Sequence, residues 1–134
     1  MKIIVRLLLT IAALGSSAAT LAQEQPVATV SQTELLSKMA TPAADLLVLD
    51  VRTAEEFAAG HIPGAVNISH DQLAARLTEL LDYKQREVIV YCRTGRRSEI
   101  AAGVLLAARF ALVRHLAGDY TAWQAAERAI VIPK

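Results

Sequence analysis

A nearly continuous apolar run, Leu46–Val51, is the feature that most restricts how this chain can fold. A run without apolar–polar alternation is typical of a strand that is buried on both faces of a parallel sheet. Four further short apolar segments are strand candidates, and helical patterns separate them; these segments are 27–30, 65–68, 88–91 and 112–116. The alternation of strands and helices predicts an α/β fold, with one parallel sheet of about five strands and helices on both faces.

The connecting segments carry helix signals. Ser31 followed by Glu34 fits a capping box, and Thr53 is placed to cap a short helix with an acidic first turn. Leucines at helical spacing indicate an amphipathic helix over 71–80, and an Ala- and Leu-rich helix is expected to open at Ser98. The helices are therefore expected to begin near residue 32 and to span 54–59, 71–80, 98–110 and 120–128.

The amino-terminal segment differs from the rest of the chain. Lys2 and Arg6 give it a positive end, Leu7–Leu14 is apolar, and small residues suit cleavage after Ala22, with Ala19 as the alternative. This is the pattern of a secretory signal peptide. The apolar core is short for the roughly 20 residues of a membrane-spanning helix. We therefore expect a signal peptide over residues 1–22.

The remainder, residues 23–134, has the length of one domain. The sequence holds 14 basic and 13 acidic residues without a block of either sign, which argues against nucleic acid or an anionic membrane as a partner. We expect the mature protein to be periplasmic or secreted, without stable membrane association. The only cysteine, Cys92, would then face an oxidising compartment, where a free thiol needs a chemical reason.

Cys92 stands between the strand candidate 88–91 and the helical pattern that follows. This order places the thiol at the edge of an α/β sheet where ligands bind. The free N–H groups of a helix start and nearby arginines both stabilise a thiolate. Gly95 permits backbone angles that let successive N–H groups turn inward around an anion. The loop therefore predicts nucleophilic catalysis by Cys92, with the anion held by Arg93, Thr94, Gly95, Arg96 and Arg97.

Other roles for Cys92 fit the sequence less well. Core cysteines are common, but they are rarely surrounded by three arginines. A metal site is not expected, because there is no second cysteine and the three histidines lack ligand spacing. Cysteine-dependent phosphatases resemble one another in an arginine six positions after the cysteine, where this chain has Ser98. The loop closes one residue earlier, at Arg97, and the tighter loop favours one sulfur atom over phosphate or arsenate.

Four motifs, in order, resemble those of a single-domain rhodanese, a thiosulfate sulfurtransferase of the small exported type. The resemblance extends from about Val27 to Ala129. The motifs are Leu49–Arg52 followed by Glu55–Phe57, then Gly60–Ile68, Val90–Ser98 and Leu116–Trp123.

The resemblance implies a single rhodanese-like domain that acts as a sulfurtransferase. Cys92 would take the outer sulfur of thiosulfate, become a persulfide, and pass the sulfur to a thiophilic acceptor such as cyanide. The backbone amides from Arg93 to Arg97 would cradle that sulfur, and no cofactor would be needed. The implied partners are a small sulfur donor and the acceptor. Two alternatives stay open: a cysteine-dependent phosphatase or arsenate reductase, and a non-enzymatic sulfur-carrier or docking module.

Two acidic residues lie near the expected site. Asp50 ends a strand at the cysteine edge, so we expect it to support the site by pairing with a loop arginine or by capping the next turn. Asp119 stands where the family usually has a second glycine. We expect it to cap the last helix; the alternative is that it faces the pocket and weakens binding of an anionic donor. Arg52 is expected to be structural, Trp123 to lie in the core and Arg114 on the solvated surface.

Overall fold

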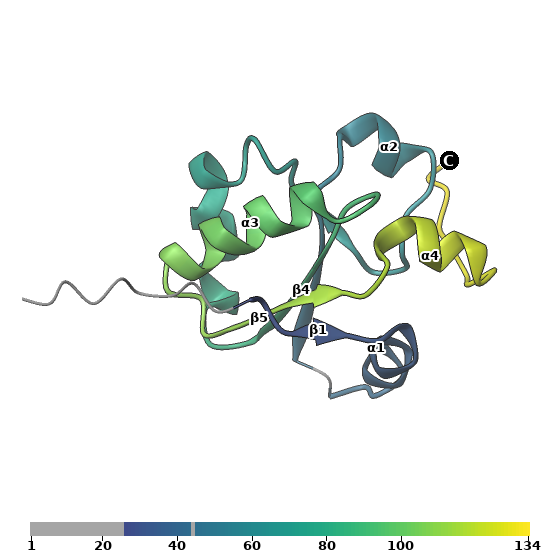
Figure 1. The fold of residues 1–134 in the computed structure, drawn as a ribbon, viewed down its shortest axis with the longest axis horizontal. Helices are drawn as coiled ribbons and strands as arrows, with labels where there is room; N and C mark the ends of the chain where they lie inside the picture. Colours follow the sequence, from purple (N-terminus) through teal and green to yellow (C-terminus); the bar gives the residue numbers. More distant parts are fainter. Residues whose placement is uncertain (1–25, 44) are drawn as a thin grey trace, which may run out of the picture.

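One parallel sheet organises the domain (Figure 1). The computed structural model describes residues 26–43 and 45–134, so the predicted signal peptide lies outside the described residues. The strands pair in the order β1-β5-β4-β2-β3, and every pair is parallel, which confirms the predicted α/β fold. The strands are β1 (Thr29–Val30), β2 (Leu46–Asp50), β3 (Val66–Asn67), β4 (Glu87–Tyr91) and β5 (Leu112–Leu116).

Helices cover both faces of the sheet. They are α1 (Gln32–Met39), α2 (Ala54–Ala58), the 3₁₀ helix η1 (Ala74–Tyr83), α3 (Arg96–Ala107) and α4 (Asp119–Ala125). None of the helices in the described ranges is both long enough and apolar enough to span a membrane.

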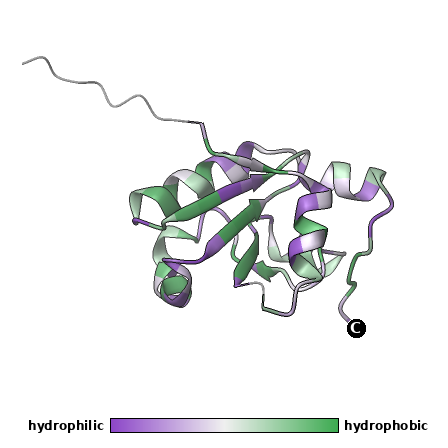
Figure 2. Ribbon diagram, turned by 90° about the horizontal axis from the view of Figure 1, so that it is seen from below, coloured by the Kyte–Doolittle hydropathy of each residue, from purple (hydrophilic) through white to green (hydrophobic). Residues whose placement is uncertain are grey.

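Alternate residues of the inner strands point to opposite faces, which gives the molecule two apolar clusters. Val88 and Val90 of β4 pack on the face that α3 and η1 cover, whereas Ile89 packs on the face of α1 and α4. Trp123 of α4 is fully buried in the second cluster, as predicted. Figure 2 shows hydrophobic residues concentrated along the strands between the helices. Burial on both faces explains why β2 and β4 lack apolar–polar alternation.

The segment after β3 is a 3₁₀ helix and begins later than expected, so the prediction of an α-helix over 71–80 is wrong. Leu77, Leu80 and Tyr83 are spaced three residues apart, and all three pack against the same cluster. Side chains at this spacing eclipse one another in a 3₁₀ helix and form one straight row. The same leucines that indicated an amphipathic α-helix therefore bury equally well in the tighter helix.

The start of α1 differs from a full capping box. The Ser31 hydroxyl accepts the Glu34 N–H at 3.1 Å, as predicted. The Glu34 carboxylate, however, accepts a hydrogen bond from Arg114 Nη1 at 2.6 Å. Arg114 also donates to Glu87 and to the carbonyl of Thr29, so it links β5 to its neighbours and is not the solvated surface residue that was expected.

Candidate active site

The ends of three parallel strands gather the candidate residues at one edge of the sheet. Asp50 at the end of β2 is in register with Tyr91 at the end of β4. Cys92 follows Tyr91 directly, and Asp119 lies three residues beyond the end of β5. Residues that are far apart in the sequence therefore meet beside Cys92, at the carboxyl edge where α/β sheets bind ligands.

The Cys92 thiol lies at the amino end of α3. Its residue is 1% exposed, and its Sγ accepts the Gly95 N–H at 3.0 Å. Gly95 is the N-cap of α3 and has a φ of +119°, a backbone conformation that L side chains rarely adopt. The helix begins at Arg96, two residues before the expected start at Ser98. The last two residues of the predicted loop are thus the first turn of the helix, with their N–H groups at its positive end.

The three arginines of the loop have different surroundings. Arg97 donates two hydrogen bonds to the Glu56 carboxylate, at 2.7 and 3.0 Å. These bonds lower the pKa of Glu56 to about 2; burial opposes the shift, and the Thr53 N–H adds to it. Glu56 raises the pKa of Arg97, with a smaller contribution from Cys92. Arg93 and Arg96 are exposed.

The first turn of α4 holds the beginning of the loop. The carbonyl of Cys92 accepts the Tyr120 N–H at 3.0 Å. The carbonyl of Arg93 accepts both the N–H and the hydroxyl of Thr121, at 3.1 and 2.8 Å. Thr94 is exposed. The loop is therefore fixed by α4 at its start and by α3 at its end.

Asp119 does not cap α4, and that prediction is wrong. Gly118 is the N-cap, while Asp119 is the first helical residue and is 2% exposed. Its Oδ1 accepts the Cys92 N–H and the Ser98 hydroxyl, each at 2.9 Å. His115 Nε2 lies 2.9 Å from both carboxylate oxygens. The site therefore includes Ser98 and His115, which sequence reasoning had not assigned to it. The sequence signal that could have found them is Asp119 itself, a carboxylate at the position where the family usually has a second glycine.

Asp50 pairs with Arg52 and not with an arginine of the loop. Its Oδ1 accepts the Arg52 N–H at 2.9 Å, which matches the expected turn cap, and its Oδ2 accepts the guanidinium at 2.6 Å. Arg52 also donates to the Gly60 carbonyl at 2.8 Å and lies 4.0 Å above the Tyr120 ring. Arg52 thus has the structural role that was expected. Together the pair ties the end of β2 to the turn after α2 and to α4.

A pocket of about 230 Å³ opens beside the cysteine loop. Its charged lining comes from Arg52, Glu56 and Arg93, and the Tyr120 ring forms part of its wall. A larger cavity of about 710 Å³ lies elsewhere, between α3 and the strands β1 and β5. Within the described ranges, no cluster of three or more His, Cys, Asp or Glu side chains is arranged to hold a metal ion.

Comparisons with known proteins agree with this geometry. Residues 31–126 match the family described as Rhodanese-like domain. A sulfurtransferase of Allochromatium vinosum is 35% identical over 101 residues, which cover 75% of this chain and 92% of that protein. Thiosulfate sulfurtransferase GlpE of Pseudoalteromonas translucida is 35% identical over 98 residues, covering 72% and 87%. The crystal structure of the Alr3790 protein from Anabaena has a TM-score of 0.69 at 27% identity, covering 76% of this chain and 80% of that one.

Proposed function

Because the chain belongs to the rhodanese-like domain family, whose members similar to it include sulfurtransferases, we propose that it is a thiosulfate sulfurtransferase that carries sulfur on Cys92. The observation that supports this most directly is the Gly95 N–H, which points at Cys92 Sγ from the start of α3 at 3.0 Å. A backbone donor and a helix terminus in this position stabilise negative charge on the sulfur.

The proposed reaction has two displacement steps. In the first, the Cys92 thiolate attacks the outer sulfur of thiosulfate; a new S–S bond forms, the S–S bond of thiosulfate breaks, and sulfite leaves with the electron pair. In the second, cyanide or another thiophilic acceptor attacks the outer sulfur of the persulfide. The acceptor–sulfur bond forms, the persulfide bond breaks, and the thiolate returns with its electron pair. Atoms and electrons balance without a cofactor.

We assign different roles in binding to the side chains and the backbone of the loop. The exposed Arg93 and Arg96 attract the anionic donor, and the backbone from Arg93 to Arg97 surrounds the transferred sulfur. Glu56 holds Arg97 in a defined orientation near the thiol. Asp50 supports the site through Arg52, which forms part of the wall of the neighbouring pocket.

Replacement of the nucleophile tests the proposal. Purified protein is expected to convert thiosulfate and cyanide to thiocyanate, and Cys92→Ser is expected to abolish this, because a hydroxyl cannot form the persulfide. Thermal unfolding of the variant is the control for folding. Thiocyanate formation that persists in folded Cys92→Ser protein would overturn the assignment.

Two further measurements separate the alternatives. A protein treated with thiosulfate is expected to gain the mass of one sulfur atom at Cys92, and absence of this gain would favour a docking module without turnover. Hydrolysis of an aryl phosphate that depends on Cys92 would favour a phosphatase. The loop argues against the latter, because the sixth position after Cys92 is Ser98 and not an arginine, and its hydroxyl donates to Asp119.

We also propose that the protein acts outside the cytoplasm. The support is the sequence of residues 1–22, with basic residues before an apolar core and small residues at its end. After expression of the full chain in a Gram-negative host, we expect the protein in the periplasmic fraction. Its mass should be that of a chain that begins at Gln23. A full-length protein retained in the cytoplasm would contradict export.

A further inference from the structure

Two ionisable side chains form a hydrogen-bonded chain that ends at the backbone of Cys92. Asp119 Oδ1 accepts the Cys92 N–H at 2.9 Å, and His115 Nε2 lies 2.9 Å from each oxygen of Asp119. The Ser98 hydroxyl donates to the same Oδ1 at 2.9 Å. The proposed sulfur transfer gives neither Asp119 nor His115 a role, although Asp119 bonds the residue that would react and His115 bonds Asp119.

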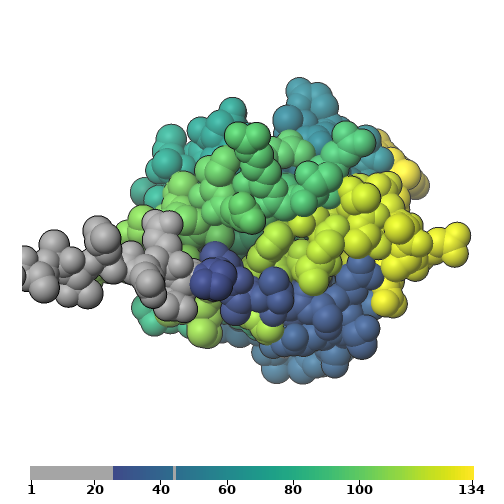
Figure 3. Space-filling view, viewed as in Figure 1, coloured from purple at the N-terminus to yellow at the C-terminus, as the bar shows by residue number. Residues whose placement is uncertain are grey.

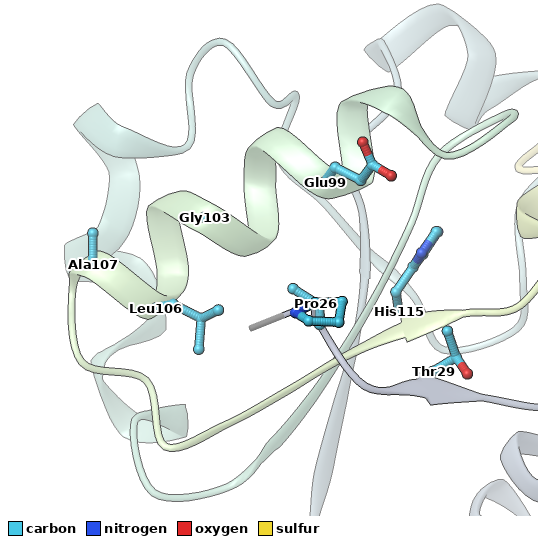
Figure 4. Close-up of a pocket in the computed structure, with 8 residues that line it drawn as sticks. Pro26, Thr29, Glu99, Gly103, Leu106, Ala107 and His115 are labelled. Carbon is cyan, nitrogen blue, oxygen red and sulfur yellow. The ribbon is translucent and has the colours of Figure 1, made fainter. Parts of the chain in front are cut away.

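Only the histidine end of this chain reaches solvent. The His115 side chain is 19% exposed, whereas that of Asp119 is 2% exposed. Figure 4 shows His115 reaching from β5 toward α3, at one end of the cavity of about 710 Å³ that Pro26 and Thr29 also line. The first described residues, dark blue in Figure 3, lie on the surface below α3. His115 can therefore exchange its proton with solvent while Asp119 stays buried.

The surroundings of His115 favour its charged form. The hydrogen bond with Asp119 of α4 raises the pKa of His115, burial opposes the shift, and Glu99 of α3 makes a smaller contribution. From β1 it faces Thr29, which carries no charge. Burial alone would raise the pKa of Asp119. His115, the Cys92 N–H and the Ser98 hydroxyl together hold that pKa below its usual value. Both shifts favour an imidazolium–carboxylate pair, and the pair persists to higher pH than it would with a free imidazole.

We propose that His115 is a positioning residue that acts through Asp119: its proton cancels the carboxylate charge behind Cys92 and so favours the approach of an anionic sulfur donor. This inference rests on the proposed sulfur transfer for its biological meaning, but the electrostatic coupling itself does not depend on turnover. With the proton present, the pair carries no net charge. With the proton lost, a full negative charge remains one hydrogen bond from the Cys92 peptide, where burial limits screening by salt.

The coupling can be measured with two alkylating reagents of similar size. Iodoacetate is an anion and iodoacetamide is neutral, and both react with the Cys92 thiolate. Their rate ratio therefore cancels the ionisation of the thiol and reports the electrostatic environment of the sulfur. In the full-chain protein, the iodoacetate-to-iodoacetamide ratio is expected to fall about three- to tenfold as pH rises from about 6 to about 9. A ratio that is independent of pH would overturn the proposal.

Two variants separate the histidine from the carboxylate. His115→Gln lacks the proton, so its ratio is expected to be low and constant over the pH range. Asp119→Asn keeps an oxygen acceptor for the Cys92 N–H but loses the charge, so its ratio is expected to exceed that of the parent at pH about 9, and its fall is expected at lower pH because His115 has lost the partner that raises its pKa. A fall in folded His115→Gln protein equal to that of the parent would refute the role of the histidine. His115→Gln alters a partly exposed side chain and is therefore expected to fold. It tests the proposal even if Asp119→Asn, which alters a buried side chain, fails to fold.

His70→Gln is the matched control, because Asp119 bonds His115 and not His70, and His70 Nδ1 has no hydrogen-bond partner within the described part of the chain. This variant is expected to retain the pH dependence of the parent; loss of that dependence would contradict the assignment to His115. The alkylation ratio needs no sulfur transfer. A protein that transfers no sulfur but shows the predicted alkylation ratios would therefore refute the proposed function and support the coupling. A protein that transfers sulfur but shows a pH-independent ratio would refute the coupling and support the proposed function.

Discussion

Arg52 and Asp50 form an ion pair from which water is nearly excluded. Their side chains are 4% and 0% exposed, and the shortest N–O distance is 2.6 Å. Removal of one partner from a buried pair leaves an uncompensated charge, which costs far more than the pair itself contributes. The guanidinium also carries the hydrogen bond to Gly60 and the contact with the Tyr120 ring, so this one side chain connects three segments around the site.

We predict that Arg52→Ala lowers the free energy of unfolding by about 3 kcal/mol or more, because Asp50 then remains buried without its partner. Urea denaturation measures the change. Arg76→Ala is the matched control, since Arg76 also forms a two-point pair with a carboxylate, Glu79, but on the exposed surface. Equal effects of the two substitutions would contradict the importance of burial.

Glu56 makes the stability of the loop depend on pH. Its pKa is lowered from 4.5 to about 2, principally by Arg97, so its carboxylate holds fewer protons in the folded than in the unfolded chain. The stabilisation is therefore complete above pH 4.5 and is lost as pH falls toward about 2. We predict that Glu56→Gln is less stable than the parent at pH 6 and that the difference narrows below pH 4.5.

Urea midpoints at a series of pH values test this prediction. Glu55→Gln is the control, because Glu55 lies in the same first turn of α2 but is exposed and is not the partner of Arg97. A difference between Glu56→Gln and the parent that stays constant down to the lowest pH would show that the ion pair with Arg97 does not contribute as the structure indicates.

At the scale of elements, α4 starts under a tight steric limit. Gly118 has a φ of +76°, and a Cβ there would lie 2.4 Å from the Cβ of Ala122. Gly64 has a similar φ of +78° but has open space around it. Alanine substitution at Gly64 therefore measures the free-energy cost of the backbone conformation alone, and substitution at Gly118 adds the cost of the clash.

We predict that Gly64→Ala costs about 1 kcal/mol through backbone strain alone. Gly118→Ala should cost about 1–3 kcal/mol more, because Ala122 must move. Thermal unfolding of both variants measures the difference. Because α4 holds the start of the loop, Gly118→Ala should also slow the alkylation of Cys92 relative to Gly64→Ala. Equal stabilities of the two variants would show that α4 can move enough to relieve the clash with Ala122 at no cost.

The start of α3 shows how a tertiary contact overrides a local signal. Serine before an Ala- and Leu-rich pattern is a normal helix-start signal, and the helix was expected to open at Ser98. Its hydroxyl donates to Asp119, the first residue of α4. The helix consequently begins at Arg96, with Gly95 as its cap. Sequence spacing alone does not reveal this competition, because the partner is 21 residues away.

At the scale of the whole molecule, stability should decrease from the centre of the sheet to its edges. β4 pairs with β2 and β5, and its apolar residues are fully buried, whereas the edge strands β1 and β3 contain two residues each. We predict that the amides of Ile89 and Val90 exchange hydrogen only through global unfolding, and that β3 exchanges through local opening. Native-state hydrogen exchange tests this: protection of Val66 equal to that of Ile89 would contradict it.

The sequence by itself determined the α/β class, the parallel sheet and the strand positions. Burial on both faces leaves a signature in β2 and β4: apolar runs without alternation, bounded by helix patterns. It also determined that Cys92 lies between a strand and a helix, because that requires only neighbours along the chain. Predicted helix ends were less accurate in two places. The leucine spacing of η1 suits both an α-helix and a 3₁₀ helix. At the start of α3, Ser98 has a hydrogen-bond partner that is distant in the sequence.

Only the tertiary structure decided which charged groups meet. Asp50 could have paired with several arginines, and Asp119 could have capped its own helix. Partner choice depends on which strand ends lie side by side, and the strand order brings the ends of β2, β4 and β5 together. The link from His115 through Asp119 to Cys92 joins β5, α4 and the loop after β4. No local pattern encodes the bond between Asp119 and Cys92, because these residues lie in distant segments that meet only once the sheet has formed.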